Sequence, residues 1–319
     1  MKRKDFAKLI SQKHHVDIFN SIHVKDNVAT GYVSMNTILS IPVANVEDGL
    51  YDAKAWGQDI LIKTNQDMSD YPDTPERKDD EFICSIDTLN IQNVSNALDK
   101  SQMFAHHILL STNENKEYFV CATNGSVLYC EGKNKEFTPK GHIIEIDCIK
   151  PMLTEKSCDM YASKDHLYFV NENYTITQRK KDVQYPNFHK IIPDLSTYNI
   201  FDMSFLTVGS ELYTISKKLG STNNQIKYVY NEGILTVENF DRAKDMLYYK
   251  SIPFDKEFDS VPFNGEFLKK TFNVKGNKIL YFKDPDSSMF IQTEQGFIII
   301  MPFSQLYDYP KEYTKHEIK

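Results

Sequence analysis

The 319-residue chain lacks several features that are typical of membrane and secreted proteins. No apolar run approaches the roughly 20 residues that a helix needs to cross a bilayer. The basic start, Met1 to Phe6, has no apolar stretch after it, so we expect no secretory leader. The five cysteines are an odd number without metal-type spacing. Together these absences predict a cytoplasmic protein with reduced thiols.

Catalytic and metal-binding motifs are also missing. The sequence has no glycine-rich phosphate loop, no His-Glu-x-x-His motif and no nucleophile elbow. The adjacent histidines at 14–15 and 106–107 would point to opposite faces of a strand, so neither pair could chelate one metal. Asp284 and Asp286 flank a proline and are better explained as a turn than as paired catalytic carboxylates. We therefore expect no catalytic residues, no cofactor and no metal.

The composition is that of a folded protein with several domains. A mass of 37.0 kDa predicts two to three domains, and 41% hydrophobic with 25% charged residues excludes a disordered chain. Twenty phenylalanines and 19 tyrosines favour strands. The net charge of −7 argues weakly against a generic nucleic-acid binder.

Turn and proline signals divide the chain into three domains. Pro186 and Pro193 cannot lie inside a sheet, because proline offers no amide hydrogen to it, so the 174–193 stretch leads out of one domain. A unit of one strand, one helix and several strands recurs roughly every 55 to 60 residues. It occurs twice in each of the later domains, and the first domain has one clear and one reduced copy. The predicted domains are residues 1–78, 79–193 and 194–305, followed by a tail at 306–319.

The expected fold class is α+β, with paired helices and antiparallel sheets. The expected helices lie at 1–13, 87–102, 151–157, 203–218 and 264–274. Gly31 is expected to break a strand, Asn124-Gly125 to form a hairpin turn, and Gly220 to end a helix.

Charge is distributed unevenly between the expected helices and the rest of the chain. The five helical windows, with the third taken as 148–158, carry a total of +7, while the remainder is acidic. Lysines on solvated helix faces would explain this, but so would a basic helical surface that contacts DNA phosphates without reading bases. The candidate DNA-binding residues are Lys2, Arg3, Lys4, Lys8, Lys150, Lys156, Lys217, Lys218, Lys269 and Lys270.

Four short motifs, in order over about 225 residues, resemble those of the bacterial DNA sliding clamp, the β subunit of DNA polymerase III. They are the hairpin Thr123-Asn-Gly-Ser-Val-Leu128, the segment from Tyr185-Pro-Asn-Phe188 to Pro193, the helix start Phe263-Asn-Gly-Glu-Phe-Leu268 and the strand Ile298-Ile-Ile-Met-Pro302. The chain departs from that family at Ser126-Val127, where the family has His-Arg, and in continuing past Pro302. The first domain would also be short.

The resemblance implies a DNA-clamp fold, a ring-shaped homo-oligomer around duplex DNA, and a role as a processivity factor that tethers DNA polymerase and the clamp loader. A homodimer is the first expectation and a homotrimer the second. The family's pocket for partner peptides maps onto Thr123, Gly125, Leu128, Pro186, Lys190, Ile191, Ile299, Met301 and Pro302. Ile191, Ile299 and Met301 could equally be core residues. The tail, with Tyr307, Tyr309 and Tyr313, could cover this pocket, occupy it or lie free.

Two other hypotheses stay open at this point. One is a clamp-fold scaffold that binds proteins without encircling DNA, and the other is an unrelated β-rich binding protein. If the basic helices converge on one face, the DNA-binding hypothesis is favoured. If they are scattered, the scaffold hypothesis is favoured.

Overall fold

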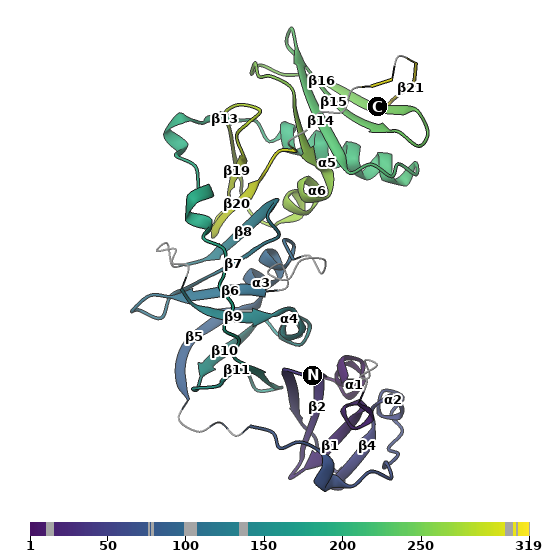
Figure 1. Cartoon of the computed structure of the whole chain (residues 1–319), viewed down its shortest axis with the longest axis vertical. Coiled ribbons are helices and arrows are strands. Elements are labelled where there is room, and N and C mark those ends of the chain that lie inside the picture. The colour runs from purple at the N-terminus through teal and green to yellow at the C-terminus, as the bar shows by residue number, and fades with distance from the viewer. Residues whose placement is uncertain are drawn as a thin grey trace. The chain divides into compact units, whose positions relative to one another are not determined.

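The computed structural model describes residues 1–10, 16–75, 77, 80–98, 107–133, 140–303, 309–310 and 312–318 (Figure 1). The chain forms two compact units. The first contains residues 1–120 and 132–186, and the second contains residues 121–131 and 187–319. The second unit therefore includes a hairpin from the middle of the chain.

The helices are α1 (Arg3–Ile10), α2 (Ala53–Trp56), α3 (Thr88–Ser95), α4 (Ile146–Met152), α5 (Ser204–Lys218) and α6 (Gly265–Asn273). The strands before residue 133 are β1 (Ser21–Lys25), β2 (Val28–Ser34), β3 (Thr37–Pro42), β4 (Gly49–Asp52), β5 (Glu81–Asp87), β6 (His107–Thr112), β7 (Tyr118–Thr123) and β8 (Val127–Gly132). They are followed by β9 (His142–Glu145), β10 (Ser157–Ala162), β11 (His166–Val170), β12 (Thr175–Arg179) and β13 (Asn199–Phe201). The remaining strands are β14 (Gln225–Asn231), β15 (Ile234–Asp241), β16 (Met246–Pro253), β17 (Val261–Asn264), β18 (Ile279–Phe282), β19 (Met289–Gln292), β20 (Gly296–Ile300) and β21 (Thr314–Glu317).

The order of elements confirms the predicted repeat. A strand, a helix and three strands occur in sequence from β5 to β8, from β9 to β12, from β13 to β16 and from β17 to β20. The N-terminal region has one copy without its first strand, α1 with β1 to β3. It also has a reduced copy, β4 with α2, in which no strand follows the helix before β5 among the described residues.

Two details of the sequence-based prediction were wrong. The helix expected at 151–157 begins earlier, at Ile146, and contains Pro151 in its last turn, where the missing amide removes only one hydrogen bond. Gly31 does not break its strand but lies within β2. A side chain there would collide with Ile10, so glycine lets α1 approach the sheet closely.

The other helices lie close to their predicted positions. The structure places α1, α3, α5 and α6 within the windows expected for them, although residues 11–13 and 99–102 fall outside the described residues. Gly220 has a φ of +86° directly after α5, as a helix-ending glycine should.

The described strands form three sheets. One has the order β4-β1-β2-β3-β12-β11-β10-β5, another the order β13-β18-β19-β20-β8-β7-β6-β9, and the third the order β17-β14-β15-β16-β21. The pairings of β3 with β12 and of β8 with β20 are antiparallel, whereas that of β16 with β21 is parallel.

The helices of each unit pack against one another and against the sheets. In the first unit, α1 contacts α2 and α4, and α4 contacts α3. In the second, α5 contacts α6, and the Phe205 ring stacks on Tyr228 with centroids 4.0 Å apart. Gly209 makes room for the Tyr228 hydroxyl. The helices within each unit therefore lie next to one another.

All five cysteines are buried, and none of them forms a disulfide bond. Burial is the main cause that raises the pKa of Cys84 and of Cys158 to about 12, so both thiols stay protonated at neutral pH. Their sulfur atoms therefore act as core packing groups.

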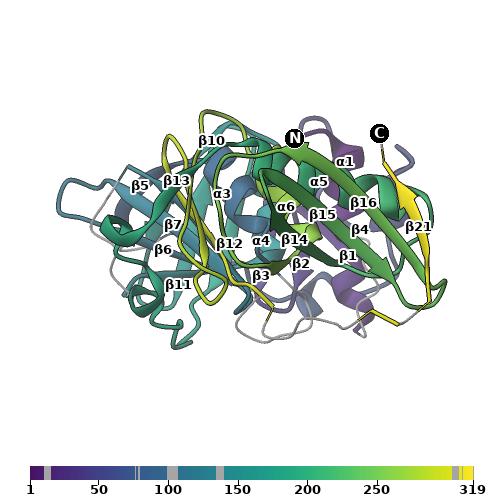
Figure 2. The same ribbon diagram turned by 90° about the horizontal axis from the view of Figure 1, so that it is seen from above.

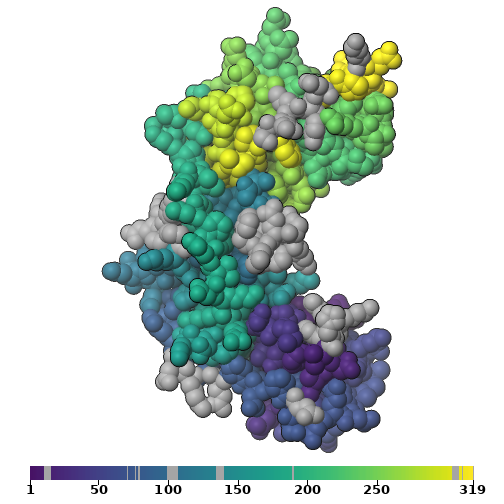
Figure 3. All heavy atoms as spheres, viewed as in Figure 1, coloured from purple at the N-terminus to yellow at the C-terminus, as the bar shows by residue number. Residues whose placement is uncertain are grey.

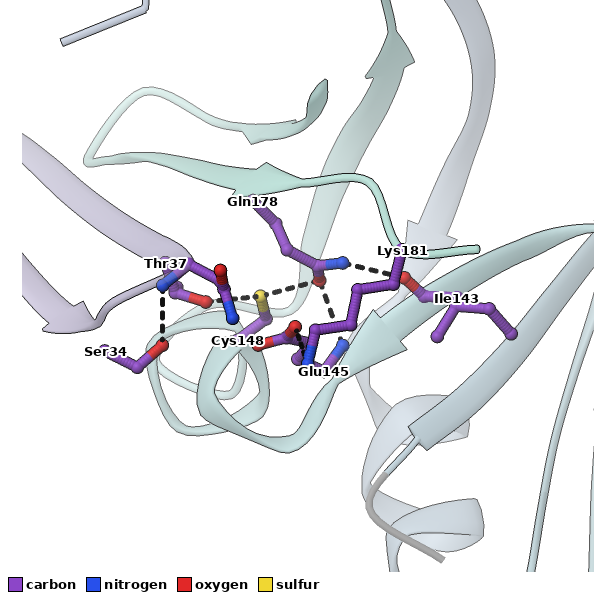
Figure 4. Close-up of polar contacts among 8 residues, drawn as sticks. Ser34, Thr37, Ile143, Glu145, Cys148, Gln178 and Lys181 are labelled. Atoms are coloured by element: carbon purple, nitrogen blue, oxygen red, sulfur yellow. Dashed lines mark hydrogen bonds and ion pairs between the residues drawn. The ribbon is translucent and has the colours of Figure 1, made fainter. Parts of the chain in front are cut away.

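A buried amide on β12 connects this strand with β9 and α4 (Figure 4). The Gln178 side chain is fully buried and donates to the Ile143 carbonyl at 2.8 Å. Its oxygen accepts from the Glu145 amide at 2.9 Å and from the Cys148 thiol at 3.1 Å. One side chain of β12 thus ties together β9 and the first turn of α4.

Replacing Gln178 by alanine should lower the free energy of unfolding by about 2 to 4 kcal/mol, because the Ile143 carbonyl and Glu145 amide lose their partner in a dry site. Urea unfolding followed by circular dichroism would measure this. The exposed Gln58→Ala provides the control and should change stability by less than about 0.5 kcal/mol. Equal stabilities for the two variants would contradict the structural role of this network.

Candidate partner-binding and DNA-facing surfaces

The predicted Asn-Gly hairpin is present in the second unit. The Asn124 carboxamide oxygen accepts from the amides of Ser126 at 3.0 Å and Val127 at 3.1 Å, and Gly125 has a φ of +87°. The Thr123 hydroxyl donates to the Val127 carbonyl at 2.8 Å and accepts from the Gly125 amide at 3.1 Å. Both side chains therefore fix the shape of the turn.

The hairpin pairs with the strand that contains the second group of predicted pocket residues. Leu128 of β8 lies opposite Ile299 of β20. The Met301 amide then donates to the Ser126 carbonyl at 2.8 Å, which extends this pairing beyond the strand. The structure thus brings the 123–128 hairpin together with Ile299, Met301 and Pro302.

Burial separates the predicted pocket residues into two groups. Leu128 and Ile299 are fully buried, so they belong to the core, whereas Met301 and Pro302 are half-buried and remain accessible. Ile191 is 39% exposed at the end of the short 3₁₀ helix Phe188–Ile191. Lys190 beside it is exposed, and Pro186, which is half-buried, belongs to the first unit.

The basic residues of the first unit lie mainly on α1. Lys2, Lys4 and Lys8 are exposed. Arg3 instead has a structural role, because its guanidinium donates to the Ala44 carbonyl at 3.0 Å and lies 5.7 Å from the centre of the Trp56 ring.

The other two basic candidates of this unit lie at either end of a turn. Lys150 is exposed in the last turn of α4. Lys156 is also exposed, but it follows α4 and precedes β10, so its predicted position inside a helix was wrong.

The candidate basic residues of the second unit lie on the adjacent helices α5 and α6. Lys218 is exposed and Lys269 is half-buried. Lys217 donates to the Thr222 carbonyl at 3.0 Å, and Lys270 forms a 2.8 Å ion pair with Glu266. Lys218 and Lys269 are therefore the better candidates for contact with a ligand.

The charge of the helices is positive, though less so than predicted. By their sequences α1 carries +2, α2, α5 and α6 carry +1 each, and α3 and α4 are neutral. The decrease arises because the helices are shorter than the windows from which the prediction was made.

No protein-family model matches the chain, and no curated protein matches its sequence. Solved structures do match. The DNA polymerase III subunit β of Pseudomonas aeruginosa aligns over 93% of this chain and 96% of its own, with a TM-score of 0.74 and 15% identity. The Helicobacter pylori β clamp bound to a DNA ligase peptide aligns over 94% and 97%, with a TM-score of 0.73 and 15% identity. The Caulobacter crescentus pol III β aligns over 96% and 99%, with a TM-score of 0.73 and 14% identity.

The chain has the fold of bacterial sliding clamps. The likeness covers almost the whole of each structure, so the resemblance in the four short motifs is confirmed at the level of the fold. Identities of 14 to 15% show that few of the residues that build the clamp fold need to be the same.

Within the clamp fold, the polar motifs that might have indicated an enzyme have structural explanations. Asp284 accepts from the Ser287 amide at 3.0 Å through its carbonyl, in the predicted turn between β18 and β19. His107 is buried in β6, whereas residues 14, 15 and 106 fall outside the described part of the chain. Over the residues that the structure describes, no three histidine, cysteine or acidic side chains are grouped to hold a metal. None of the described helices is long and apolar enough to span a membrane.

Sequence reasoning missed two features of the C-terminal region. Phe303, directly after Pro302, is 40% exposed, and its amide donates to the Pro262 carbonyl at 2.9 Å. The tail also contains an ordered strand, β21, that pairs with β16. The 314–317 stretch is short and entirely polar, so no alternation of apolar and polar residues could have indicated a strand.

Proposed function

We propose that the chain is a DNA polymerase processivity clamp that encircles duplex DNA. The observation that carries this proposal is the match of the clamp fold over at least 93% of this chain and 96% of each of the three clamp structures. A ring that is topologically linked to DNA does not need tight binding, so a net charge of −7 is compatible with this role.

The proposal includes the predicted organisation of the chain. Domains at 1–78, 79–193 and 194–305 would form part of a ring that is completed by a second copy, or by two further copies. The protein would act in the cytoplasm, would bind DNA without sequence preference and would catalyse no reaction.

The proposed DNA-facing surface is the set of basic candidates on, or next to, the helices of each unit. Arg3, Lys217 and Lys270 make contacts within the protein. The other members are exposed or half-buried, and they are Lys2, Lys4, Lys8, Lys150, Lys156, Lys218 and Lys269. Lysines of this kind attract phosphates over a distance set by ionic strength and carry no base-reading groups, which suits sliding.

The proposed partner site is an apolar surface that includes Ile191, Met301 and Pro302, next to the 123–128 hairpin. Support comes from the structure of the H. pylori clamp, which is described as bound to a DNA ligase peptide. Exposed isoleucine and half-buried methionine side chains suit the apolar anchors of an extended peptide, since methionine adapts to irregular surfaces.

The decisive experiment compares retention on circular and linear DNA. The protein would be assembled on a nicked circular plasmid with a clamp loader, and a restriction enzyme would then linearise half of the sample. A ring should stay on the circle and leave the linear DNA through its ends. Equal retention on both forms would contradict encirclement and favour the scaffold that binds proteins alone.

A further inference from the structure

The repeats of this chain are joined by a simple rule. Numbering the copies along the chain, the first ends in β3, the third in β8, the fourth in β12, the fifth in β16 and the sixth in β20. The last strand of the first copy pairs with that of the fourth, and the last strand of the third pairs with that of the sixth. Both joints are antiparallel. The last strand of the fifth copy does not pair with the last strand of another copy. By the same rule its partner would belong to the second copy, which is the reduced one.

The second copy retains only a remnant where its strands would be. After α2, the chain runs back beside β4, where the Asp52 amide donates to the Ile62 carbonyl at 2.9 Å and the Thr64 amide to the Leu50 carbonyl at 2.8 Å. Ile60, Leu61 and Ile62 are exposed by 50%, 44% and 53%. Three consecutive exposed apolar side chains on an extended edge segment are typical of a surface that another chain covers.

The edge of the fifth copy is covered by the chain's own terminus (Figure 2). Met246 to Tyr249 of β16 pair in parallel with β21, the Thr314 amide donates to the Asp245 carbonyl at 2.9 Å, and the Ile318 amide donates to the Tyr249 carbonyl at 2.8 Å. This pairing differs from the other two joints because it is parallel and covers only the first four of the eight residues of β16. The 250–253 half of β16 has no strand beside its outer edge among the described residues.

Aromatic side chains hold the terminus in place. Phe240 lies on the face of β15 that points away from the buried residues Leu235 and Val237, yet it is only 4% exposed. The rings of Tyr309 and Tyr313 lie 5.1 Å and 5.7 Å from it, and the Tyr309 hydroxyl donates to the Glu238 carboxylate. In Figure 3 the C-terminal segment, in yellow at the upper right, lies against the green surface of the same unit.

We propose that β21, together with Tyr309 and Tyr313, is a removable cover for the edge that closes the ring, and that a second copy of this chain docks there through its 60–64 segment. The inference rests on the proposed function. In the free subunit the cover protects an open edge from unspecific pairing. On assembly, the remnant of the second copy in one subunit pairs with β16 of the other, starting at the uncovered 250–253 half. This restores the joint that the repeat rule requires and buries the apolar triplet.

The test compares the full-length protein with a variant that ends at Phe303, by sedimentation equilibrium over a concentration series. We expect the shortened protein to form a discrete species of twice the subunit mass, with a dissociation constant at least tenfold lower than that of the full-length protein. A full-length double variant, Tyr309→Ala with Tyr313→Ala, should give an intermediate value, because it loosens the cover without removing it.

A second comparison identifies the docking segment. Adding Ile60→Asp with Ile62→Asp to the shortened protein should abolish the gain, and since both side chains are exposed, these changes should leave the fold intact. Unchanged association after shortening, weaker association, open-ended aggregates or a gain that persists in the aspartate variant would each overturn the proposal. Retention on circular DNA is measured separately. If shortening the tail does not change assembly, the proposed cover is disproved but the clamp function is not. Equal loss from circular and linear DNA would instead disprove the clamp function.

Discussion

Replacing Ile191 and Met301 together by alanine should weaken the binding of a peptide from the tail of the partner polymerase by about 100-fold or more. Both side chains are accessible at the proposed site, at 39% exposure for Ile191 and half-buried for Met301. Removing two apolar anchors from a peptide-binding surface costs about 3 kcal/mol or more, which corresponds to this factor. Isothermal titration calorimetry with the peptide would measure the change.

A matched control separates this effect from a general loss of apolar surface. Ile200 and Ile279 belong to the same unit and are 58% and 43% exposed on β13 and β18. The variant Ile200→Ala with Ile279→Ala should bind the peptide as the unaltered protein does. Undiminished affinity in the Ile191–Met301 variant would place the peptide site elsewhere on the chain.

Much of the fold was predictable because its signals are local. The repeat of strand, helix and three strands follows from hydrophobic alternation and from turn residues such as Gly125 and Gly220, whose positive φ angles the structure confirms. The missed elements have weak local signals. Pro151 suggested a helix that starts at this proline, although α4 starts at Ile146. The β16 segment is a mixed run of polar and apolar residues, and its extended conformation is determined by pairing with β15.

The candidate site was predictable only in part. The structure brings the hairpin and the terminal strand together, as the resemblance implied, but it places Leu128 and Ile299 in the core. Sequence alone could not make this distinction, because the alternation of a strand does not show which of its faces is covered. Similarly, the packing of Tyr309 and Tyr313 on Phe240 depends on a contact between segments about 70 residues apart.

Reversing four lysines on α5 and α6 should remove most of the protein's direct affinity for a short linear duplex, which is not held by topological linkage. The variant carries glutamate at Lys217, Lys218, Lys269 and Lys270, and it should lower the slope of log affinity against log salt by about 3 to 4, since each phosphate contact contributes about 0.9. Fluorescence anisotropy of the labelled duplex at several salt concentrations would measure both quantities. Unchanged affinity at low salt would contradict a DNA-facing role for these helices.

A smaller variant shows whether the loss comes from contact with DNA or from a damaged fold. Lys217 and Lys270 make contacts within the protein, whereas Lys218 is exposed and Lys269 is half-buried. The double reversal Lys218→Glu with Lys269→Glu should therefore lower the slope by about 2 with no change in stability. The matched control reverses the exposed Lys256 and Lys283, which lie outside the helices. Because both doubles change the net charge equally, a larger effect of the helical pair would show that position, and not total charge, governs the affinity for DNA.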